Sequence, residues 1–346
     1  MKTVYSPLHA GHAGTMELIS GAIVPGFEKP SRAEIIRARV ESEKLGPILP
    51  PQAHGLDAAK RVHRADYIDF LPTVYPAWEA SGRSGSAIPF TWPTRGLRGD
   101  VLPKTIDAQL GFYAFDGGAP FVKGTWEAIK SSYEVALTAA ALVNNGERAA
   151  FALCRPPGHH AGDAFMGGYC YINNAAVAAQ WYRDHGAARV SILDVDYHHG
   201  NGTQQIFYPR ADVQVINLHA DPLVEYPFFL GHADEKGEGA GEGFNLNYPM
   251  PFGTAFEAWS TALDDACAKL AAYAPDVVVV SLGVDTFEKD PISEFKLRSA
   301  DYPKIGRRIA ALGLPTLFVM EGGYAVDEIG VNAVGVLTGF ADAAGG

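Results

Sequence analysis

Five short runs of apolar, mostly β-branched residues constrain the fold of this chain more than any other feature. They are AAFALC (149–154), RVSILDVD (189–196), VQVINLH (213–219), DVVVVSLGVD (276–285) and PTLFVMEGGY (315–324). Continuous apolar runs of this length are typical of strands that are buried on both faces. We therefore predict a sheet that is covered on both sides.

Helix-like segments alternate with these runs. They span 173–184, 255–273, 300–312 and 326–340, and earlier helices near 31–43 and 60–70 are expected to pack outside the sheet. This alternation predicts an α/β fold in which a mostly parallel sheet lies between helix layers. The chain has 346 residues, 47% of them apolar, so it can bury one large core, and we predict a single domain over 1–346.

The segment from Tyr75 to Thr125 has a different character. It is rich in glycine, proline and aromatic residues and shows no clear periodicity. Long loops in compact domains usually have a function, so we predict a lid over the site or a subunit contact.

Composition narrows the classes of function. The sequence has no run of 18 or more apolar residues and no apolar leader, so we expect a soluble cytoplasmic protein. Three cysteines without a C-x-x-C pair argue against a disulfide framework and against a thiolate metal site. The net charge of −11 argues against nucleic-acid binding and is compatible with a cationic ligand.

Residues capable of chemistry follow four of the apolar runs, at the carboxyl end of each. They are His159 and His160; Asp194, Asp196 and His198; Asp285; and Glu321 with Tyr324. In open parallel sheets, ligands bind beyond the carboxyl ends of the strands. Each residue alone is equally compatible with a helix cap or a satisfied core group, but the shared pattern predicts an active site.

The run ILDVDYHHGNGT predicts a metal site. Strand side chains alternate between faces, so Asp194, Asp196 and His198 share one face if the extended conformation continues. Two carboxylates and an imidazole on one face require a cation, and Asp285 is the natural further ligand. Oxygen and nitrogen ligands without a thiolate suit a catalytic Zn²⁺, and they also accept Fe²⁺, Co²⁺ or Mn²⁺.

The neighbouring polar residues predict acid–base catalysis. His159 and His160 are compatible with a role as ordinary loop residues. As catalysts, they could take a proton from water and return it to a leaving amine, because the pKa of an imidazole is near ~6.5. Asp194 and Asn201 are candidates for orienting these imidazoles. Tyr324 follows two glycines and is expected to donate a hydrogen bond to a substrate carbonyl oxygen.

Two features of the same run are expected to be structural. His199 has the opposite strand parity to His198, which predicts a satisfied core histidine. The glycines of GNG (200–202) are expected to let the backbone turn tightly into a helix.

Together these motifs resemble the histone deacetylase superfamily, and within it the bacterial acetylpolyamine amidohydrolases. The motifs are KRVHRADYIDFL, RPPGHHAGDAFMGGYCYINNAA, ILDVDYHHGNGTQQIFY, SLGVDTFEKDPIS and MEGGY. The resemblance implies the three-layer arginase-deacetylase fold, with a mostly parallel sheet of about eight strands between helix layers.

The resemblance also implies roles for individual residues. These are a catalytic Zn²⁺ on Asp196, His198 and Asp285; His160 as general acid and base, paired with Asn201; His159 as its electrostatic partner, paired with Asp194; and Tyr324 polarising the scissile carbonyl. A structural K⁺ or Na⁺ is implied as well. Its ligands would be Asp194, the carbonyls of Asp196, His198 and Leu218, and Asn217, where a serine is usual.

A substrate channel and a dimer follow from the same resemblance. Gly168, Tyr169 and Tyr226 match channel-lining positions, and the 75–125 loop would support a homodimer, narrow the channel and present Asp107 and Asp116 to an ammonium group. Two departures from the family's usual residues bear on the length of the polyamine that the channel accepts. They are GG at 117–118, where a relative carries a glutamate, and Glu294 near the channel mouth, where an aromatic residue is common.

We therefore expect zinc-dependent hydrolysis of acetylated polyamines, which are small cationic amines, with no nucleic-acid or membrane partner. The alternatives are a protein or peptide acetyl-lysine deacetylase, a ureohydrolase with two Mn²⁺ ions, and a non-catalytic sensor of acetylated ligands. The single D-V-D-Y-H run and Tyr324 argue against the ureohydrolase, and the long loop and acidic charge favour small amines over proteins.

Overall fold

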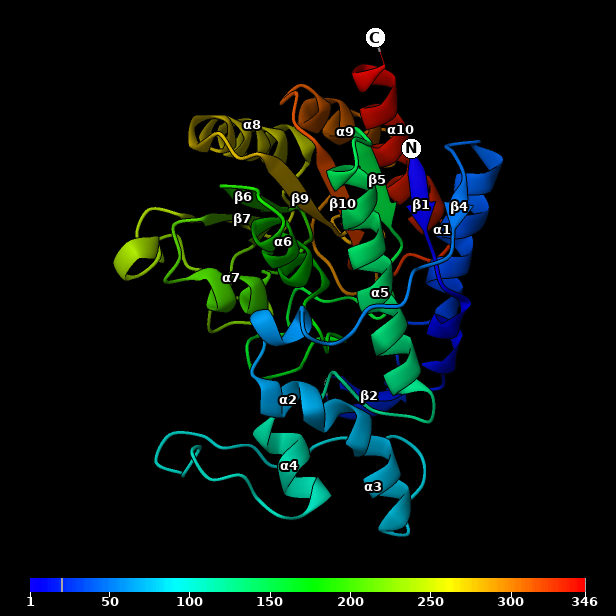
Figure 1. Cartoon of the computed structure of the whole chain (residues 1–346), viewed down its shortest axis with the longest axis vertical. Helices are drawn as coiled ribbons and strands as arrows, with labels where there is room; N and C mark the ends of the chain where they lie inside the picture. The colour runs from blue at the N-terminus through cyan, green and yellow to red at the C-terminus, as the bar shows by residue number, and fades with distance from the viewer. Residues whose placement is uncertain (20, 346) are drawn as a thin grey trace.

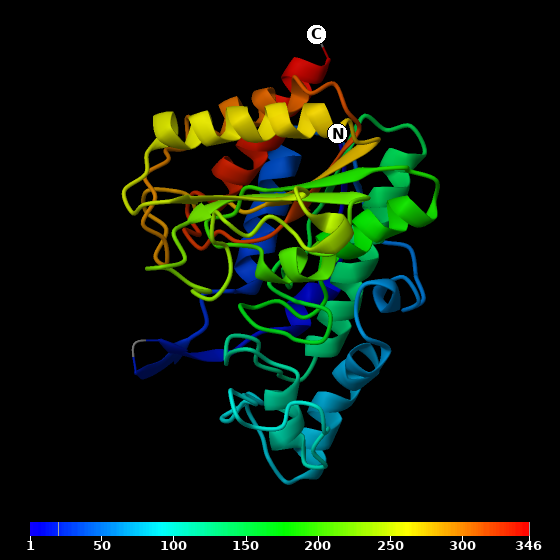
Figure 2. The ribbon, with the colours of Figure 1, turned by 90° about the vertical axis from the view of Figure 1, so that its left-hand side faces the viewer.

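An eight-stranded sheet lies at the centre of the molecule, whose computed structural model describes residues 1–19 and 21–345. The strand order is β4-β1-β5-β10-β9-β6-β7-β8, and every neighbouring pair is parallel. The strands are β1 (Lys2–Val4), β4 (Ile48–Leu49), β5 (Ala149–Ala152), β6 (Val190–Asp194), β7 (Val213–Ala220), β8 (Asn245–Met250), β9 (Val277–Leu282) and β10 (Thr316–Met320). A separate antiparallel hairpin, β2 (Met16–Ile19) and β3 (Ala22–Pro25), projects from the body (Figure 2).

Helices cover both faces of the sheet, as the sequence predicts. Helices α5 and α6 pack on one face, and α1, α8, α9 and α10 pack on the other (Figures 1 and 2). The α-helices are α1 (Pro30–Ser42), α2 (Ala65–Phe70), α3 (Val74–Ala80), α4 (Ile106–Phe112), α5 (Thr125–Asn144), α6 (Asn174–Asp184), α7 (Asn201–Phe207), α8 (Phe256–Tyr273), α9 (Tyr302–Ala310) and α10 (Ile329–Ala344). Four 3₁₀ turns join them in the described chain: η1 (Pro7–Gly11), η2 (Ala59–Arg61), η3 (Leu71–Thr73) and η4 (Gly239–Gly241).

The valine run of β9 shows why the sheet has two cores. Val277 and Val279 belong to the core beneath α5 and α6, whereas Val278 and Val280 belong to the core beneath α8, α9 and α10. All four are buried, because alternate side chains of a strand point to opposite faces and both faces are covered. Of the helices described, none is long and apolar enough to cross a membrane.

The segment from 75 to 125 is more ordered than its sequence predicts. It contains most of α3 and all of α4, which lie with α2 at the end of the molecule farthest from α8 (Figure 1). In α4, Ile106 and Leu110 are one turn apart and both are buried. Each of these helices spans only seven residues, too few for an apolar period to stand out.

The strands end earlier than the apolar runs do. The structure ends β6 at Asp194 and follows it with a bend, so the extended conformation that would place Asp194, Asp196 and His198 on one face does not continue. Likewise β9 ends at Leu282 and β10 at Met320. The chemically capable residues therefore lie in irregular segments just beyond the sheet, where the backbone is free of the strand alternation.

Candidate active site and metal centre

A buried group of three side chains forms where the chain leaves β6 and β9. Oxygen or nitrogen atoms of Asp196, His198 and Asp285 all lie within 4.8 Å of one another. His198 Nδ1 lies 3.1 Å from Asp285 Oδ2 and 3.4 Å from Asp196 Oδ1. Burial, together with the negative charge of Asp196, raises the pKa of Asp285 to about 7. Two carboxylates held this closely call for a positive charge between them.

The donor set fits a divalent metal. Backbone amides hold the carboxylates in place: Tyr197 N donates to Asp285 Oδ1 at 2.9 Å, and Gly322 N donates to Asp196 Oδ2 at 2.8 Å. Two carboxylates and one imidazole, with no thiolate, match the three protein ligands of a catalytic zinc site and also suit Fe²⁺ or Co²⁺. Asp194 is not part of this group, since the bend after β6 directs its carboxylate elsewhere.

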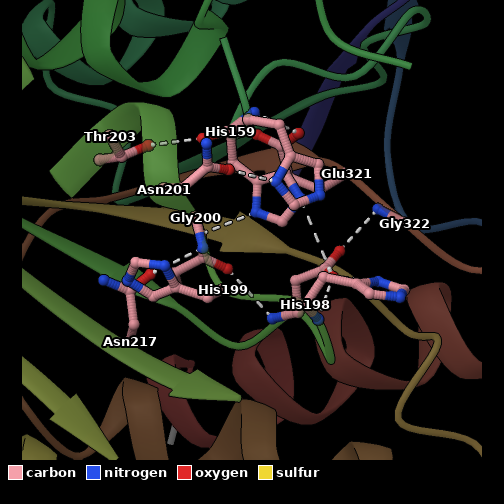
Figure 3. A network of polar contacts seen from close by, with 12 residues as sticks. His159, His198, His199, Gly200, Asn201, Thr203, Asn217, Glu321 and Gly322 are labelled. Atoms are coloured by element: carbon pink, nitrogen blue, oxygen red, sulfur yellow. Dashed lines mark hydrogen bonds and ion pairs between the residues drawn. The ribbon is translucent and has the colours of Figure 1, made fainter. Parts of the chain in front are cut away.

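The two adjacent histidines differ in their partners, and Figure 3 labels His159 and Asn201, the partner of His160. His159 Nδ1 lies 3.0 Å from Asp194 Oδ2, whereas His160 Nδ1 lies 2.7 Å from the amide oxygen of Asn201. Burial acts to lower the pKa of His159, but Asp196 and Asp194 outweigh it and raise that pKa to about 10. Burial and the positive charge of His159 lower the pKa of His160 well below its usual value. The pair therefore combines one charged imidazole with one neutral imidazole that can accept a proton.

Glu321 holds the turn that carries these histidines. Its Oε2 accepts hydrogen bonds from Gly158 N at 2.7 Å and from His159 N at 3.1 Å. Ligand atoms of His159, Cys170 and Glu321 also lie within 4.8 Å of one another. Burial raises the pKa of the Cys170 thiol well above its usual value.

Tyr324 reaches the site through two glycines that no larger residue could replace. A Cβ on Gly322 would lie 2.4 Å from Asp285 Oδ2, and one on Gly323, where φ is +127°, would lie 2.6 Å from Val284 Cγ2. Burial raises the pKa of the Tyr324 hydroxyl well above its usual value, so the group stays protonated and can donate a hydrogen bond. The guanidinium of Arg32 lies 4.7 Å from the centre of the Tyr324 ring.

The GNG glycines are needed for close approach rather than for a turn. Gly200 has a φ of −73°, open to any residue, but a Cβ there would lie 2.4 Å from Asp194 Oδ2. A Cβ on Gly202 would lie 2.2 Å from Ala161 O. His199 is buried as expected, and its Nε2 lies 3.0 Å from Gln204 Oε1, while its Nδ1 has no partner among the described residues.

Two of the residues expected around a monovalent cation, Asp194 and Asn217, lie beside Gly200, and Figure 3 shows Asn217 there. Gly200 N donates to Asn217 Oδ1 at 3.3 Å, and Asp196 N donates to Asp194 Oδ1 at 3.1 Å. Leu218 follows Asn217 within β7 and is buried.

This geometry agrees with a comparison of the sequence to known families. The family model described as the histone deacetylase domain matches residues 26–340. This chain belongs to the histone deacetylase family. Its members hydrolyse amides, and the fold of this member is the arginase-deacetylase fold.

The relatives of this family member include several acetylpolyamine amidohydrolases. Acetylpolyamine amidohydrolase 1 of Pseudomonas aeruginosa is 57% identical over 345 residues, 99% of this chain and 100% of the relative. The acetylpolyamine amidohydrolase of Mycoplana ramosa is 50% identical over 341 residues, 99% of this chain and 100% of the relative. A crystal structure of an acetylpolyamine aminohydrolase from Burkholderia pseudomallei matches with a TM-score of 0.94 at 38% identity, covering 99% of both chains.

A cavity of about 610 Å³ in this family member is lined by His160 and by His198, one of the candidate metal ligands. Three of its lining residues are acidic (Glu17, Asp116 and Glu225), and no lysine or arginine lines it in the described chain. Its aromatic lining consists of Trp92, Tyr169, Tyr226, Phe228 and Tyr324. Gly168 is also in the wall, where a Cβ would lie 2.4 Å from His160 Cδ2. The expected channel residues Gly168, Tyr169, Tyr226 and Asp116 thus lie together.

Two expected channel residues do not lie with them. Asp107 pairs with Arg83 at 2.8 Å on the outer side of α4, and Glu294 is exposed, 3.8 Å from Lys296. Neither is among the residues that line the cavity. Asp116 does line it, but its carboxylate already accepts hydrogen bonds from Tyr226 Oη at 2.7 Å and from Gly118 N at 2.8 Å. Asp116 is therefore a hydrogen-bonded part of the cavity wall and is not a carboxylate that is free to bind an ammonium group.

Glu17 is the main cavity residue that the sequence did not reveal. It lies on β2, and its carboxylate accepts hydrogen bonds from Tyr169 Oη at 2.6 Å and Phe27 N at 2.7 Å. Nothing in its local sequence distinguishes it from a surface glutamate. Only the folding of the hairpin against the channel brings it to the site.

Proposed function

We propose that this family member hydrolyses the N-acetyl amide of small acetylated polyamines, giving acetate and a free amine, and that it does so with one bound zinc ion. The proposal depends on two features that occur together, a buried group of candidate metal ligands and an adjoining acidic cavity. The buried group of Asp196, His198 and Asp285 adjoins, through His198, a cavity whose described lining has acidic residues and no lysine or arginine.

The metal would be held by Asp196, His198 and Asp285, whose atoms already converge. When bound there, zinc would make a water molecule more acidic and polarise the acetyl carbonyl. Fe²⁺ and Co²⁺ accept the same ligands. We also propose that Asp194, Asn217 and the carbonyls of Asp196, His198 and Leu218 hold a structural K⁺ or Na⁺.

His160 would move the proton. Its low pKa leaves it neutral at pH 7, and the Asn201 oxygen at 2.7 Å fixes the proton on Nδ1, so Nε2 is free to accept. It would take the proton from the attacking water and deliver it to the departing amine. His159, kept charged by Asp194 and Asp196, would favour the negative charge that develops on the carbonyl oxygen.

Tyr324 would donate its hydroxyl hydrogen to that oxygen. The hydroxyl stays protonated because burial raises its pKa, and the ring lines the same cavity as His160 and His198. A donor fixed in advance costs no reorganisation when the charge appears.

Acidic residues in the cavity favour a cationic substrate. Glu17 and Glu225 line it, and a positive amine at the far end of an acetylated chain would be attracted to them. The relatives named acetylpolyamine amidohydrolase, at 57% and 50% identity, support the same substrate class.

The 75–125 segment would act as the lid of this channel and as a contact in a homodimer. Ile88, Pro89 and Trp92 of this segment line the cavity, and Phe90 in the same stretch is 74% exposed. A lid of this kind would exclude a folded protein while admitting a linear amine.

The test compares acetate release from N-acetylputrescine with release from N-butylacetamide, which has the same chain length but lacks the distal amine. We expect a higher kcat/KM for N-acetylputrescine, mainly through a lower KM, and loss of turnover for both after chelation. Equal values for the two amides would contradict the polyamine assignment while leaving amide hydrolysis intact.

A further inference from the structure

Tyr324 lies in a segment without regular secondary structure, so its position depends on tethers from elsewhere. β10 ends at Met320 and α10 begins at Ile329. Arg32 holds the carbonyl side of this segment, donating to Gly323 O at 2.6 Å and to Glu321 O at 2.7 Å. The amide side is held by a different residue, to which the mechanism above gives no part.

That residue is Asp290. Its Oδ2 accepts hydrogen bonds from Tyr324 N at 2.7 Å and from Ala325 N at 3.1 Å. Its Oδ1 accepts one from Ile292 N at 3.2 Å, and Ile292 lines the cavity together with Tyr324. A single carboxylate therefore joins the backbone of the hydroxyl donor to the backbone of the channel wall.

The carboxylate is costly in this position. Asp290 is only 6% exposed, and no lysine, arginine or histidine of the described chain forms an ion pair with it. Burying a charge without a counter-ion is unfavourable, and the three amide hydrogen bonds offset part of that cost. Hydrogen bonds to a charged acceptor are about twice as strong as neutral ones, which makes this a stiff tether.

Stiffness at this point matters because the Tyr324 hydroxyl must meet a small target. An oxyanion donor has to lie about 2.7–3.1 Å from the oxygen that becomes charged. Misplacement by about 1 Å can cost on the order of 10²-fold in rate. Gly322 and Gly323 precede Tyr324 and restrain the backbone poorly by themselves.

We propose that Asp290 is a positioning residue that acts through Tyr324: it fixes the backbone at Tyr324 and Ala325 so that the phenol hydroxyl points at the substrate carbonyl. This role rests on the proposed deacetylase function. It makes the rate of turnover depend on Asp290 although the carboxylate forms no hydrogen bond with a candidate metal ligand.

The experiment is a double-mutant cycle with Asp290→Asn and Tyr324→Phe, using acetate release from N-acetylputrescine. Asparagine keeps only one acceptor oxygen. Its NH₂ group takes the place of the other oxygen and would face a backbone N–H donor. We expect Asp290→Asn to lower kcat about tenfold or more, bounded by the 10²–10³-fold range for one lost oxyanion donor, with KM and bound metal unchanged. In the Tyr324→Phe background, the same substitution is expected to change kcat less than about twofold.

Asp276→Asn is the matched control. Asp276 Oδ2 also accepts hydrogen bonds from two consecutive backbone amides, Ala188 N at 2.6 Å and Arg189 N at 2.9 Å, but at the opposite end of β9. This variant should keep wild-type kcat. If Asp290→Asn proves unstable, Asp290→Glu retains the charge and displaces the oxygens, so its loss of kcat should likewise vanish in the Tyr324→Phe background.

The outcomes are distinct. Loss of kcat that disappears without the Tyr324 hydroxyl supports the positioning role. Equal loss in both backgrounds, or wild-type kcat in Asp290→Asn, overturns it while leaving the deacetylase function in place. An inactive wild-type protein with full metal content overturns the proposed function, and this role with it.

Discussion

His160 Nδ1 faces the amide oxygen of Asn201 at 2.7 Å, while the adjacent His159 faces a carboxylate. An amide fixes the position of the His160 proton and stabilises the charged imidazolium less than a carboxylate would. The pKa of His160 therefore stays below its usual value, lowered by burial and by the charge of His159. This difference in partners separates a proton acceptor from a fixed positive charge within one dipeptide.

Asn201→Asp should give His160 a carboxylate partner of the kind that His159 already has. A carboxylate beside His160 raises its pKa by about 1–3 units. His160 would then remain protonated to higher pH, so activity at neutral pH should fall and the acidic limb of the kcat/KM profile should move upward. A pH–rate profile from pH 5 to 9 measures the shift; an acidic limb in the same place would show that His160 is not the base.

Tyr324→Phe should lower kcat by roughly 10²–10³, the range for loss of one oxyanion donor. The ring and its contact with Arg32 remain, so metal content and thermal stability should be unchanged. Single-turnover kinetics with metal analysis of the same sample would measure both. Undiminished turnover would remove Tyr324 from the mechanism.

Chelation should destabilise the protein as well as inactivate it. Asp196 and Asp285 are buried together, and burial with the charge of Asp196 raises the pKa of Asp285 to about 7, so the metal-free site holds repelling carboxylates. A ligand that binds only the folded state adds about 4 kcal/mol at 1,000 times its Kd. Thermal melts should show a lower Tm after chelation and recovery on adding Zn²⁺.

Asp285→Asn serves as the control for that experiment. Its Tm should not respond to Zn²⁺, since one ligand has lost its charge. A wild-type Tm that is indifferent to metal would contradict the assignment of this site.

The ion cluster around Glu28 should make stability depend on pH in a defined window. Glu28 Oε1 accepts hydrogen bonds from Arg32 at 2.7 Å and from Arg155 at 2.8 Å. Burial alone would raise the pKa of Glu28, but the two guanidinium groups lower it from 4.5 to about 2. The folded pKa lies below the unfolded one, so the contribution is complete above pH 4.5 and is lost as the pH falls to about 2.

Glu28→Gln should therefore lower the free energy of unfolding by about 3–5 kcal/mol at pH 7, because it leaves buried guanidinium groups unpaired. It should also flatten the pH dependence between 4.5 and 2. Asp100→Asn, which breaks the exposed pair with Arg98, should change neither. Urea titrations at several pH values would measure both effects. If the free energy of unfolding of Glu28→Gln depended on pH as steeply as that of the wild type, the role of Glu28 would be contradicted.

The parts of this protein that could be predicted from sequence are those set by short-range pattern. Apolar runs indicated β5, β6, β7, β9 and β10, and the polar residues after them indicated where the site lies. The strand period failed beyond Asp194, because the chain bends there and side-chain direction is no longer set by alternation.

What the sequence did not reveal depends on packing between distant segments. Glu17 reaches the channel from a hairpin, and Arg155 meets Glu28 across 127 positions of chain. Asp107 was expected at the channel, yet the orientation of α4 turns it outward to Arg83. No local pattern encodes these contacts, since each is fixed only when whole elements dock.

The most direct test of the account is acetate release by the zinc-loaded protein with N-acetylputrescine, N-acetylcadaverine, N-acetylspermidine and an acetyl-lysine peptide compared side by side. We predict release from all three small amines, at a kcat/KM well above that for the peptide, and none from Asp285→Asn. Preference for the peptide, or no release from any of these amides by protein with full metal content, would contradict it.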